Sequence, residues 1–537
     1  MKHYDKHIDT FFENFNNDKS PGCSLAVIQE GEIIFKKGYG MSNLEYSIPN
    51  QSDSVFYIAS VSKQFAAMCI LLLEEDGLLK LEDEVRKYIP GLPSYADRIT
   101  ISHLIHHTSG LRDFLGLFFL SGHRADELIT NEQALDLICR QKSLNFDPGE
   151  EFLYCNSGYF LLSIITERVS GKTMREFSQE RIFDPLGMKY TRFHDDRNEL
   201  IHNKAVGYAP DDCGRFKVNA PGLETVGSGG IYSTVEDLYL WDQNFYENKL
   251  GCGKPSLIAS MLTPGRLNNG KELDYAYGLT KRLFAGEKVI GHSGGFGGYS
   301  AQFIQFPERK LSIVCLSNHQ MLNAPYYTFE VAKLFLKEKS DKVSLLSREI
   351  DNKNGLIDSQ VCGLYYNDQT TSSLWVRMHE NQVQIRFKGT WMNLTLQENG
   401  CYQIKDQKSL TEFKFEFKSD PSKVIIIGED SKEETLERIQ IYRSSDDEIS
   451  TLTGEYYNDE MQAKAIIWKK NQKLTMKIGR HEMELDPTLK DLYLSSLGAL
   501  QFTRDDSGFT NTMNVRAGRV RKIIFQRVWK ELYAQKL

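Results

Sequence analysis

Long apolar runs are missing from this 537-residue chain. No stretch reaches the roughly 18 apolar residues that a membrane-spanning helix needs. The first residues, Met1 to His7, lead into a polar segment that lacks the apolar core of a signal peptide. We therefore expect no membrane span and a cytoplasmic location. Export after removal of a signal sequence stays open as the alternative.

The chain also lacks an excess of positive charge. It has 65 Lys and Arg against 72 Asp and Glu, a net charge of −7. A protein that binds nucleic acid through its phosphates needs a basic surface. We therefore expect no nucleic-acid partner and instead a small-molecule or short-peptide substrate; self-association into a homo-oligomer stays open.

Cysteines are present but without the spacings of a disulfide framework. Their number is odd, and several lie inside apolar runs, which favours buried, reduced thiols. The nine are Cys23, Cys69, Cys139, Cys155, Cys213, Cys252, Cys315, Cys362 and Cys401.

The length and a change of pattern predict several domains. A chain of 537 residues is too long for one ordinary core. Apolar helical runs and strands fill residues 1–338, and a polar linker follows at 339–355. Short alternating segments, typical of strands with one buried face, fill the rest.

This last part contains a repeat. The segment Gly363–Asp368 recurs 91 residues later as Gly454–Asp459, and an alternating strand pattern follows each copy. The repeat predicts two all-β units, 356–446 and 447–537, each a small barrel or sandwich.

The first candidate for chemistry is the segment Phe56–Lys63, which leads into the apolar run Phe65–Leu73. A run that is apolar on every side predicts a helix buried all round. Ser60 and Lys63, three residues apart, then share one helix face, so a hydroxyl and an amine lie within reach of each other. They form a possible nucleophile and base, while free N–H groups of the first turn could hold an oxyanion. Alone the pattern is weak, because serine is common as a helix cap.

Two further patterns follow in order along the chain. Tyr154-Cys155-Asn156 stands on a loop just before a second largely apolar helix, and His292-Ser293-Gly294-Gly295 stands at the end of a strand. Each pattern on its own is more often a turn or a core tyrosine. Their occurrence together, in this order, is far more specific.

A metal site is the competing interpretation. The spacing of His103, His106 and His107 would allow zinc binding on a helix. No glutamate stands between them as a metallopeptidase helix would require, so we expect these histidines to pack or cap near the rim of the active site.

Taken together, the three patterns resemble those of the serine β-lactamase and penicillin-binding protein superfamily. The similarity is to the branch of class C β-lactamases, DD-carboxypeptidases, D-aminopeptidases and related esterases, and it covers Gly22 to about Leu336. Framework pieces that share it are His107–Leu111, Pro148-Gly149, Ser157–Tyr159, Pro185–Met188 and Gly229–Ser233. The β units after the linker resemble the lipocalin-like barrels of D-aminopeptidase-type members.

The resemblance implies a fold and a metal-free chemistry without a cofactor. The fold is α+β: an antiparallel sheet flanked by helices, with a helical subdomain, followed by two all-β barrels. Ser60 would attack a carbonyl carbon and form an acyl-enzyme, with Lys63 or Tyr154 as general base. Asn156 would hydrogen-bond the substrate amide, and the backbone N–H groups of Ser60 and Gly295 would form the oxyanion hole.

In this superfamily the third motif is usually Lys-Thr-Gly, His-Thr-Gly or a variant, and here it is His292-Ser293-Gly294. His292 could hydrogen-bond Tyr154 or bind a substrate carboxylate. Histidine is, however, a weaker permanent cation than lysine. Ser293 and Gly294 would be further substrate-binding residues. The Glu-x-x-Leu-Asn pattern of class A β-lactamases is absent from the sequence. We therefore expect a serine hydrolase of amides or esters, acting on small D-amino-acid peptides. The alternatives are a β-lactamase or esterase of the same fold, or a slowly deacylating penicillin-binding sensor.

Overall fold

A computed structural model describes residues 2–124, 126–211, 213–336, 361–370, 372–387, 390–396, 402–404, 414–417, 422–427 and 433–528. The chain divides into two units, one of Met1–Leu115 with Arg124–Asp341 and one of Gly116–His123 with Lys342–Leu537. The linker predicted at 339–355 lies outside the described residues.

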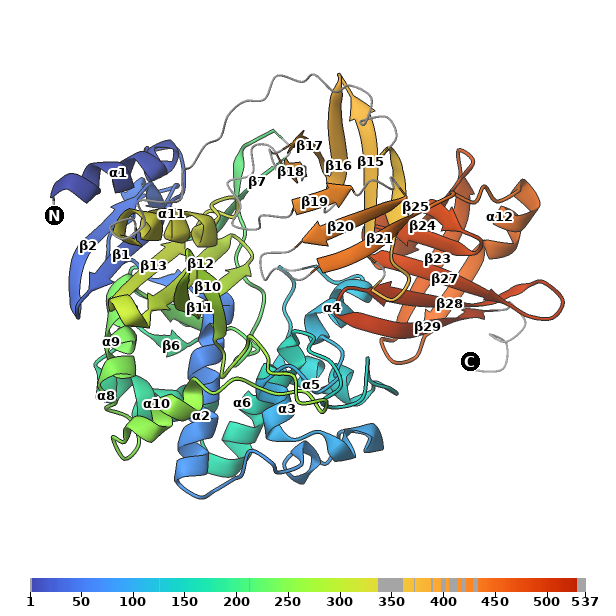
Figure 1. Ribbon diagram of the computed structural model, residues 1–537. Helices are drawn as coiled ribbons and strands as arrows, with labels where there is room; N and C mark the ends of the chain where they lie inside the picture. Colours follow the sequence, from blue (N-terminus) through green and yellow to red (C-terminus); the bar gives the residue numbers. More distant parts are fainter. Residues whose placement is uncertain are drawn as a thin grey trace. The chain divides into compact units, whose positions relative to one another are not determined.

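The first unit is built on a six-stranded antiparallel sheet in the order β10-β11-β12-β13-β1-β2 (Figure 1). Strand β1 lies between β13 and β2, with Cys23 opposite Ser317 and Gln29 opposite Leu311. Strands from the two ends of this unit's sequence thus meet in the middle of the sheet, and the segment between them supplies most of the helices. The six strands are β1 (Cys23–Gln29), β2 (Glu32–Tyr39), β10 (Thr280–Phe284), β11 (Glu287–Phe296), β12 (Tyr299–Phe306) and β13 (Leu311–Ser317).

Helices cover both faces of this sheet. Helix α11 (Ala324–Leu336) packs on β12 and β13, and α1 (Lys2–Phe12) lies beside α11 (Figure 1). Helix α9 (Val235–Tyr246) packs on β1 and β13. The arrangement confirms the predicted α+β class, because each layer buries one apolar face against the next.

The predicted all-apolar helix is α2 (Lys63–Glu75), and every residue from Lys63 to Leu73 is buried. It packs against α6 (Asn156–Ser170). Gly77 follows with a φ of 73°, a left-handed conformation that ends a helix at little cost. The remaining α-helices of four or more residues that begin in the described part of this unit's sequence are α3 (Ile101–Ile105), α4 (Phe114–Leu120), α5 (Asn131–Cys139), α7 (Met174–Ser178) and α10 (Pro255–Met261).

From the sequence we expect one helix to end at Gly110, a glycine stop, and a later helix to be capped by Ser233 through a capping box with Glu236. Both boundaries differ in the structure. Helix α3 ends at Ile105 rather than near Gly110, because His107 takes a left-handed φ of 57°. Helix α9 is capped by Thr234, whose hydroxyl accepts from the Asp237 N–H, rather than by Ser233. Both serine and threonine suit a cap, so residue type alone could not choose between neighbours.

The sequence also predicts a glycine-rich bend from Ser293 to Tyr299, and the structure differs here as well. Strand β11 runs on through it to Phe296, and Gly294 pairs with Ala301 of β12. Glycine is rare in strand interiors, so its composition favoured a turn. The strand instead carries the third motif toward Ser60.

The second unit contains two closed barrels of eight strands each, β14 to β21 and β22 to β29. The first closes where β14 (Gly363–Tyr366) pairs with β21 (Glu433–Ile439), and the second where β22 (Gly454–Asn458) pairs with β29 (Val520–Val528). In the first barrel, the strands between β14 and β21 are β15 (Ser373–His379), β16 (Gln382–Phe387), β17 (Thr390–Leu396), β18 (Tyr402–Ile404), β19 (Lys414–Phe417) and β20 (Lys423–Ile427). Those of the second are β23 (Ala463–Lys470), β24 (Lys473–Ile478), β25 (His481–Leu489), β26 (Leu492–Ser495), β27 (Gly498–Arg504) and β28 (Thr510–Ala517), and α12 (Asp446–Leu452) precedes β22.

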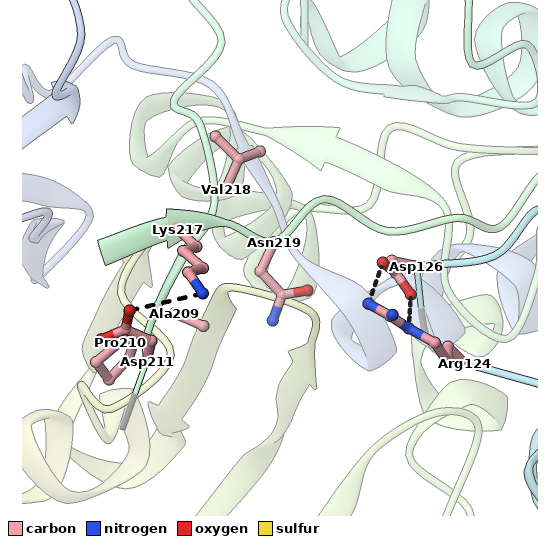
Figure 2. A pocket seen from close by; sticks show the side chains of 8 residues that line it. All are labelled: Arg124, Asp126, Ala209, Pro210, Asp211, Lys217, Val218 and Asn219. Atoms are coloured by element: carbon pink, nitrogen blue, oxygen red, sulfur yellow. Dashed lines mark hydrogen bonds and ion pairs between the residues drawn. The ribbon is translucent and has the colours of Figure 1, made fainter. Parts of the chain in front are cut away.

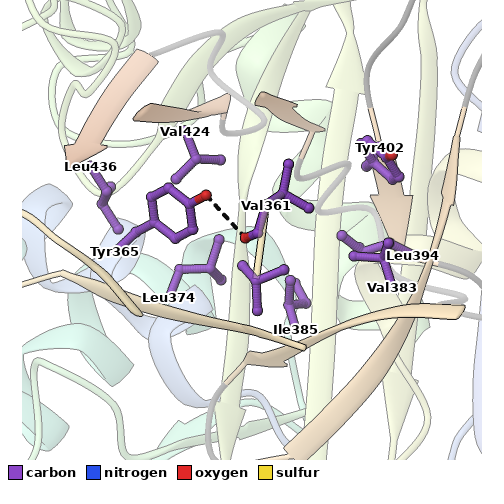
Figure 3. Packing of buried hydrophobic residues seen from close by; sticks show 10 residues of the cluster. Val361, Tyr365, Leu374, Val383, Ile385, Leu394, Tyr402, Val424 and Leu436 are labelled. Atoms are coloured by element: carbon purple, nitrogen blue, oxygen red, sulfur yellow. Dashed lines mark hydrogen bonds between the residues drawn. The ribbon is translucent and has the colours of Figure 1, made fainter. Parts of the chain in front are cut away.

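Buried apolar side chains fill the first barrel (Figure 3). Within them, the Tyr365 hydroxyl donates to the Val361 carbonyl oxygen over 3.0 Å. The second barrel repeats this contact, from Tyr456 to the Leu452 carbonyl over 2.9 Å. The sequence repeat is therefore a repeat of structure.

None of the helices in the described part of the chain has the length and apolarity that crossing a bilayer requires.

Removing the hydroxyl of one of these two tyrosines should destabilise the first strand of its barrel. In Tyr456→Phe the buried Leu452 carbonyl loses its donor, which should lower the opening free energy of β22 by about 1 kcal/mol. Hydrogen exchange of β22 peptides, followed by mass spectrometry, measures this. The matched control is Tyr457→Phe, which removes a hydroxyl from the next residue; equal protection in both variants would contradict the role of the bond.

Candidate active site

Ser60 and Lys63 are brought together as their spacing predicts. Ser60 lies in a short 3-10 turn (Ala59–Ser62) that leads directly into α2. The Lys63 Nζ lies 3.2 Å from Ser60 Oγ. Ala59, just before the serine, has a φ of 47°, which is unusual for a residue with a side chain. This unusual backbone conformation thus lies directly before Ser60, which stays partly exposed.

The Lys63 side chain is fully buried. Besides Ser60, its Nζ lies 2.9 Å from Asn156 Oδ1 and 2.6 Å from the Ser228 carbonyl oxygen. Both of these atoms can only accept, so they fix two N–H groups of the amine. The third hydrogen-bonding position of the nitrogen faces Ser60 Oγ.

The second motif lies against the same amine. Lys63 Nζ is 4.8 Å from the centre of the Tyr154 ring, and Asn156 is the first residue of α6. Three segments far apart in sequence, around residues 60, 154 and 228, therefore meet at one nitrogen.

Two residues that we did not predict as site residues hold this loop in place. Asp113 accepts the Asn156 backbone N–H at 2.7 Å, which puts a carboxylate at the positive end of α6. His107 accepts the Cys155 N–H at Nδ1 over 3.0 Å, and its ring centre is 4.3 Å from that of Tyr154. His107 belongs to a framework segment recognised by resemblance, but nothing in the sequence links either residue to the loop.

His292 lies on β11, buried beside this group. Its Nδ1 is 2.5 Å from the Ser293 carbonyl oxygen, which can only accept, so Nδ1 carries a hydrogen. Its Nε2 is 3.1 Å from the Tyr275 hydroxyl. Burial, with the positive charge of Lys63, lowers the pKa of His292 to about 3. The ring is therefore neutral near pH 7, and Nε2 accepts from Tyr275.

The hydrogen bond of His292 differs from the bond to Tyr154 that the sequence allowed. Tyr275, rather than Tyr154, supplies the hydroxyl at Nε2, while the ring centres of Tyr154 and His292 are 5.9 Å apart. A neutral imidazole is also a poor partner for a carboxylate. Tyr275 is another site residue that the sequence gave no reason to select.

The glycines of the third motif have different surroundings. A Cβ placed on Gly294 would lie 2.2 Å from the Ile58 carbonyl oxygen and 3.1 Å from the Ser60 nitrogen. A Cβ placed on Gly295 would lie 3.9 Å from the nearest surrounding atom. Only Gly294 is thus required for β11 to approach the nucleophile, while Ser293 and Gly295 are exposed.

A pocket of about 300 Å³ opens at the hairpin of β7 (Tyr208–Pro210) and β8 (Phe216–Val218). Arg124 pairs with Asp126 and Lys217 with Asp211, and Asn219 lies between the pairs in Figure 2. The Asn219 carbonyl accepts from the Gly298 N–H, in the turn just after β11. The pocket therefore adjoins the strand of the third motif.

The histidine cluster does not converge on one point. His103 caps α3 through Thr100, and His106 Nδ1 lies 3.0 Å from the Ser102 carbonyl oxygen. His107 belongs to the Tyr154 loop. Within the described ranges, no group of three or more His, Cys, Asp or Glu side chains is placed to hold a metal ion. The eight described cysteines have free thiols.

Comparison with known sequences gives one family match and many relatives. The sequence model of the family described as Beta-lactamase matches residues 8–327. Penicillin-binding protein 4* of Bacillus subtilis (strain 168) is 30% identical over 453 residues, covering 81% of this chain and 98% of the relative. The D-aminopeptidase of Brucella anthropi is 27% identical over 349 residues, covering 64% of this chain and only 65% of the relative.

Solved structures agree on the fold. An octameric penicillin-binding protein homologue from Pyrococcus abyssi is similar with a TM-score of 0.57 and 23% identity, covering 89% of this chain and 99% of that one. A penicillin-binding protein from Bacillus halodurans has a TM-score of 0.53 and 24% identity, covering 62% of this chain and 99% of that one.

The contrast between the two glycines can be tested by adding one methyl group to each. Gly294→Ala should force β11 away from Ser60 and lower the rate of covalent labelling by a fluorophosphonate roughly 100-fold, the scale of a lost oxyanion contact. Gly295→Ala has room and keeps its N–H, so it should stay within a few-fold of the parent. Similar rates for the two variants would contradict the close approach at Gly294.

Buried histidines should make the stability of the first unit fall in acid. Burial lowers the pKa of His292 to about 3 and those of His106 and His319 to about 4. The unfolded chain, with histidine pKa values of about 6.5, then binds more protons than the folded chain below that pH. The free energy of unfolding should thus be highest above about pH 6.5 and decrease as the pH falls toward 4.

Calorimetry between pH 7 and 4 measures this slope. His106→Asn should flatten it by up to about 1.4 kcal/mol per pH unit, whereas the exposed His202→Asn should leave it unchanged. Parallel slopes in the parent and in His106→Asn would show that His106 takes up its proton without unfolding.

Proposed function

Because the chain belongs to the Beta-lactamase family, we propose that this serine hydrolase forms an acyl-enzyme on Ser60 and cleaves amides or esters of short D-amino-acid peptides. The observation that carries the proposal is the position of the Lys63 amine. It lies within hydrogen-bond distance of Ser60 Oγ while Asn156 and the Ser228 carbonyl fix its other directions. A hydroxyl needs such a neighbour to become a nucleophile at neutral pH.

The reaction begins at the Ser60 hydroxyl. Its oxygen bonds to the substrate carbonyl carbon, and its proton passes to Lys63 or to Tyr154, whichever of the two has itself first given up a proton. Negative charge develops on the carbonyl oxygen, where the N–H groups of Ser60 and Gly295 can donate to it. The bond to the leaving amine or alcohol then breaks, the leaving group takes up a proton, and the acyl group stays on Ser60. Water releases it by the same steps in reverse order.

Asn156 is suited to hold the substrate. Its side-chain oxygen is turned to Lys63, which leaves the amide nitrogen to donate to a substrate carbonyl. Ser293, exposed on the other face of β11 from His292, offers a further hydroxyl. The pocket at the β7–β8 hairpin adjoins the turn that follows β11.

The substrate class is argued from His292 and from the relatives. A neutral imidazole adds no charge for a substrate carboxylate, which favours aminopeptidase, amidase or esterase chemistry over a carboxypeptidase. Several relatives are D-aminopeptidases, at 26–29% identity. These observations support D-configured amides and esters as the first substrates to test.

A second candidate is a protein that is acylated once and then acts as a sensor. It is favoured by the two barrels, which make up a large part of the chain, and by the relative named as a penicillin-binding protein. Turnover separates the two: a sensor gives one stoichiometric burst, whereas an enzyme continues.

Ser60→Ala is the direct test of the nucleophile. Turnover and covalent labelling by a fluorophosphonate or a fluorescent penicillin should both fall to background, because the attacking oxygen is gone. Ser170→Ala, at the far end of α6, serves as the matched control and should label normally. Retained turnover in Ser60→Ala would rule out the mechanism.

A substrate panel then decides the class. The purified protein should cleave p-nitroanilides and esters of D-alanine at least roughly tenfold faster than those of L-alanine, the discrimination expected from a pocket fitted to one configuration. A chromogenic cephalosporin belongs in the same panel. Faster steady hydrolysis of that compound would identify a β-lactamase instead, and preference for L-alanine would overturn the D-specific part.

The proposal also includes a cytoplasmic location and a homo-oligomer. The free thiols, two of them exposed at Cys213 and Cys252, favour a reducing compartment. The similar protein from Pyrococcus abyssi is described as octameric. Light scattering during size-exclusion chromatography measures the mass in solution.

A further inference from the structure

Tyr275 lies at the centre of the buried aromatic group beside the nucleophile. Only 3% of it is exposed. Its ring centre is 4.6 Å from that of His107 and 6.3 Å from that of Tyr154, and its hydroxyl is 3.1 Å from His292 Nε2. None of the three sequence motifs contains it.

We propose that Tyr275 is a positioning residue of the reaction, whose hydroxyl holds His292 as a neutral imidazole with its hydrogen on Nδ1. The kinetic part of this inference rests on the proposed hydrolase function. The part that concerns the state of the ring does not.

The hydrogen-bond partners fix the tautomer. The Ser293 carbonyl oxygen requires a hydrogen on Nδ1, so in the neutral ring Nε2 has only a lone pair. A buried lone pair without a donor would be costly, and the Tyr275 hydroxyl satisfies it. The choice of tautomer by the partner of the other nitrogen is a general property of histidine.

The charged groups that face His292 also favour its neutral form. Lys63 on α2 and Arg282 on β10 are positive and disfavour a second cation there. Tyr154 faces the ring at a centre-to-centre distance of 5.9 Å. A hydroxyl that donates to Nε2 stabilises the neutral ring further. Tyr275 thus keeps His292 uncharged and closes Nε2 to the substrate.

This arrangement predicts a selectivity. With Nε2 occupied, His292 cannot bind a substrate carboxylate, so substrates without a free carboxylate at this position are preferred. Removing the Tyr275 hydroxyl opens Nε2, and the ring can then take up a proton and meet a carboxylate as the pH falls.

Tyr275→Phe in the full-length protein tests the proposal, because it keeps the ring and removes only the hydroxyl. Tyr277→Phe is the matched control: it removes a hydroxyl two residues away, from a ring that packs edge-on against His106. Nitrogen-15 spectra of histidine-labelled protein report the tautomer and protonation of His292, whose signal is assigned as the one missing in His292→Ala.

The parent and Tyr277→Phe should show a neutral ring with hydrogen on Nδ1 from pH 8 to 5. Tyr275→Phe should show a changed tautomer or the onset of protonation within this range. Its kcat on a D-alanine anilide should fall roughly 2- to 10-fold, the scale of one hydrogen bond between neutral groups. Its kcat/KM for D-alanyl-D-alanine relative to D-alanine amide should rise as the pH is lowered, and that of Tyr277→Phe should not.

Two results would overturn the proposal. One is an identical His292 spectrum and pH profile in Tyr275→Phe and Tyr277→Phe. The other needs no variant and holds even where Tyr275→Phe fails to fold: a parent ring with hydrogen on Nε2, or doubly protonated, at pH 7. If Ser60 is never acylated, the proposed function fails, and the spectra still decide the role of Tyr275.

Discussion

The hydrogen bonds of one buried amine organise this site. Lys63 Nζ contacts Ser60 Oγ, Asn156 Oδ1 and the Ser228 carbonyl, and these come from three segments separated by about 70 to 170 residues. A buried lysine that lost these partners would be costly to the fold. The same contacts that make its burial tolerable therefore also direct its nitrogen toward Ser60 Oγ.

The rest of the first unit keeps these segments in register. Helix α2 is buried along its length and packs on α6, which fixes Lys63 and Asn156 relative to each other. Strand β11 reaches Ser60 because Gly294 has no side chain. Behind this first layer, Asp113, His107 and Tyr275 each satisfy one polar atom of the motifs. Such supporting contacts are what hold a reactive group within a narrow geometry.

Much of this could be predicted from the sequence because it depends on local pattern. The apolar run Phe65–Leu73 predicted the buried helix, and the 91-residue repeat predicted two similar β units. The spacing of Ser60 and Lys63 predicted their contact, since residues three apart share a helix face. Boundaries were less certain where neighbouring residues suit the same role, as at Ser233 and Thr234, or where a histidine rather than a glycine takes the left-handed conformation, as at His107.

The sequence by itself determined the family resemblance, the order of the three motifs and the residues able to react, because these follow from residue type and spacing. Only the tertiary structure decided what surrounds them. The charge of His292 depends on its burial, on Lys63 and on Tyr275, which lies 17 positions before it in another segment. The acceptors for the N–H groups of Cys155 and Asn156 come from more than 40 residues away. Contacts of this kind arise when distant segments close on one another in three dimensions, and no local period in the sequence records them.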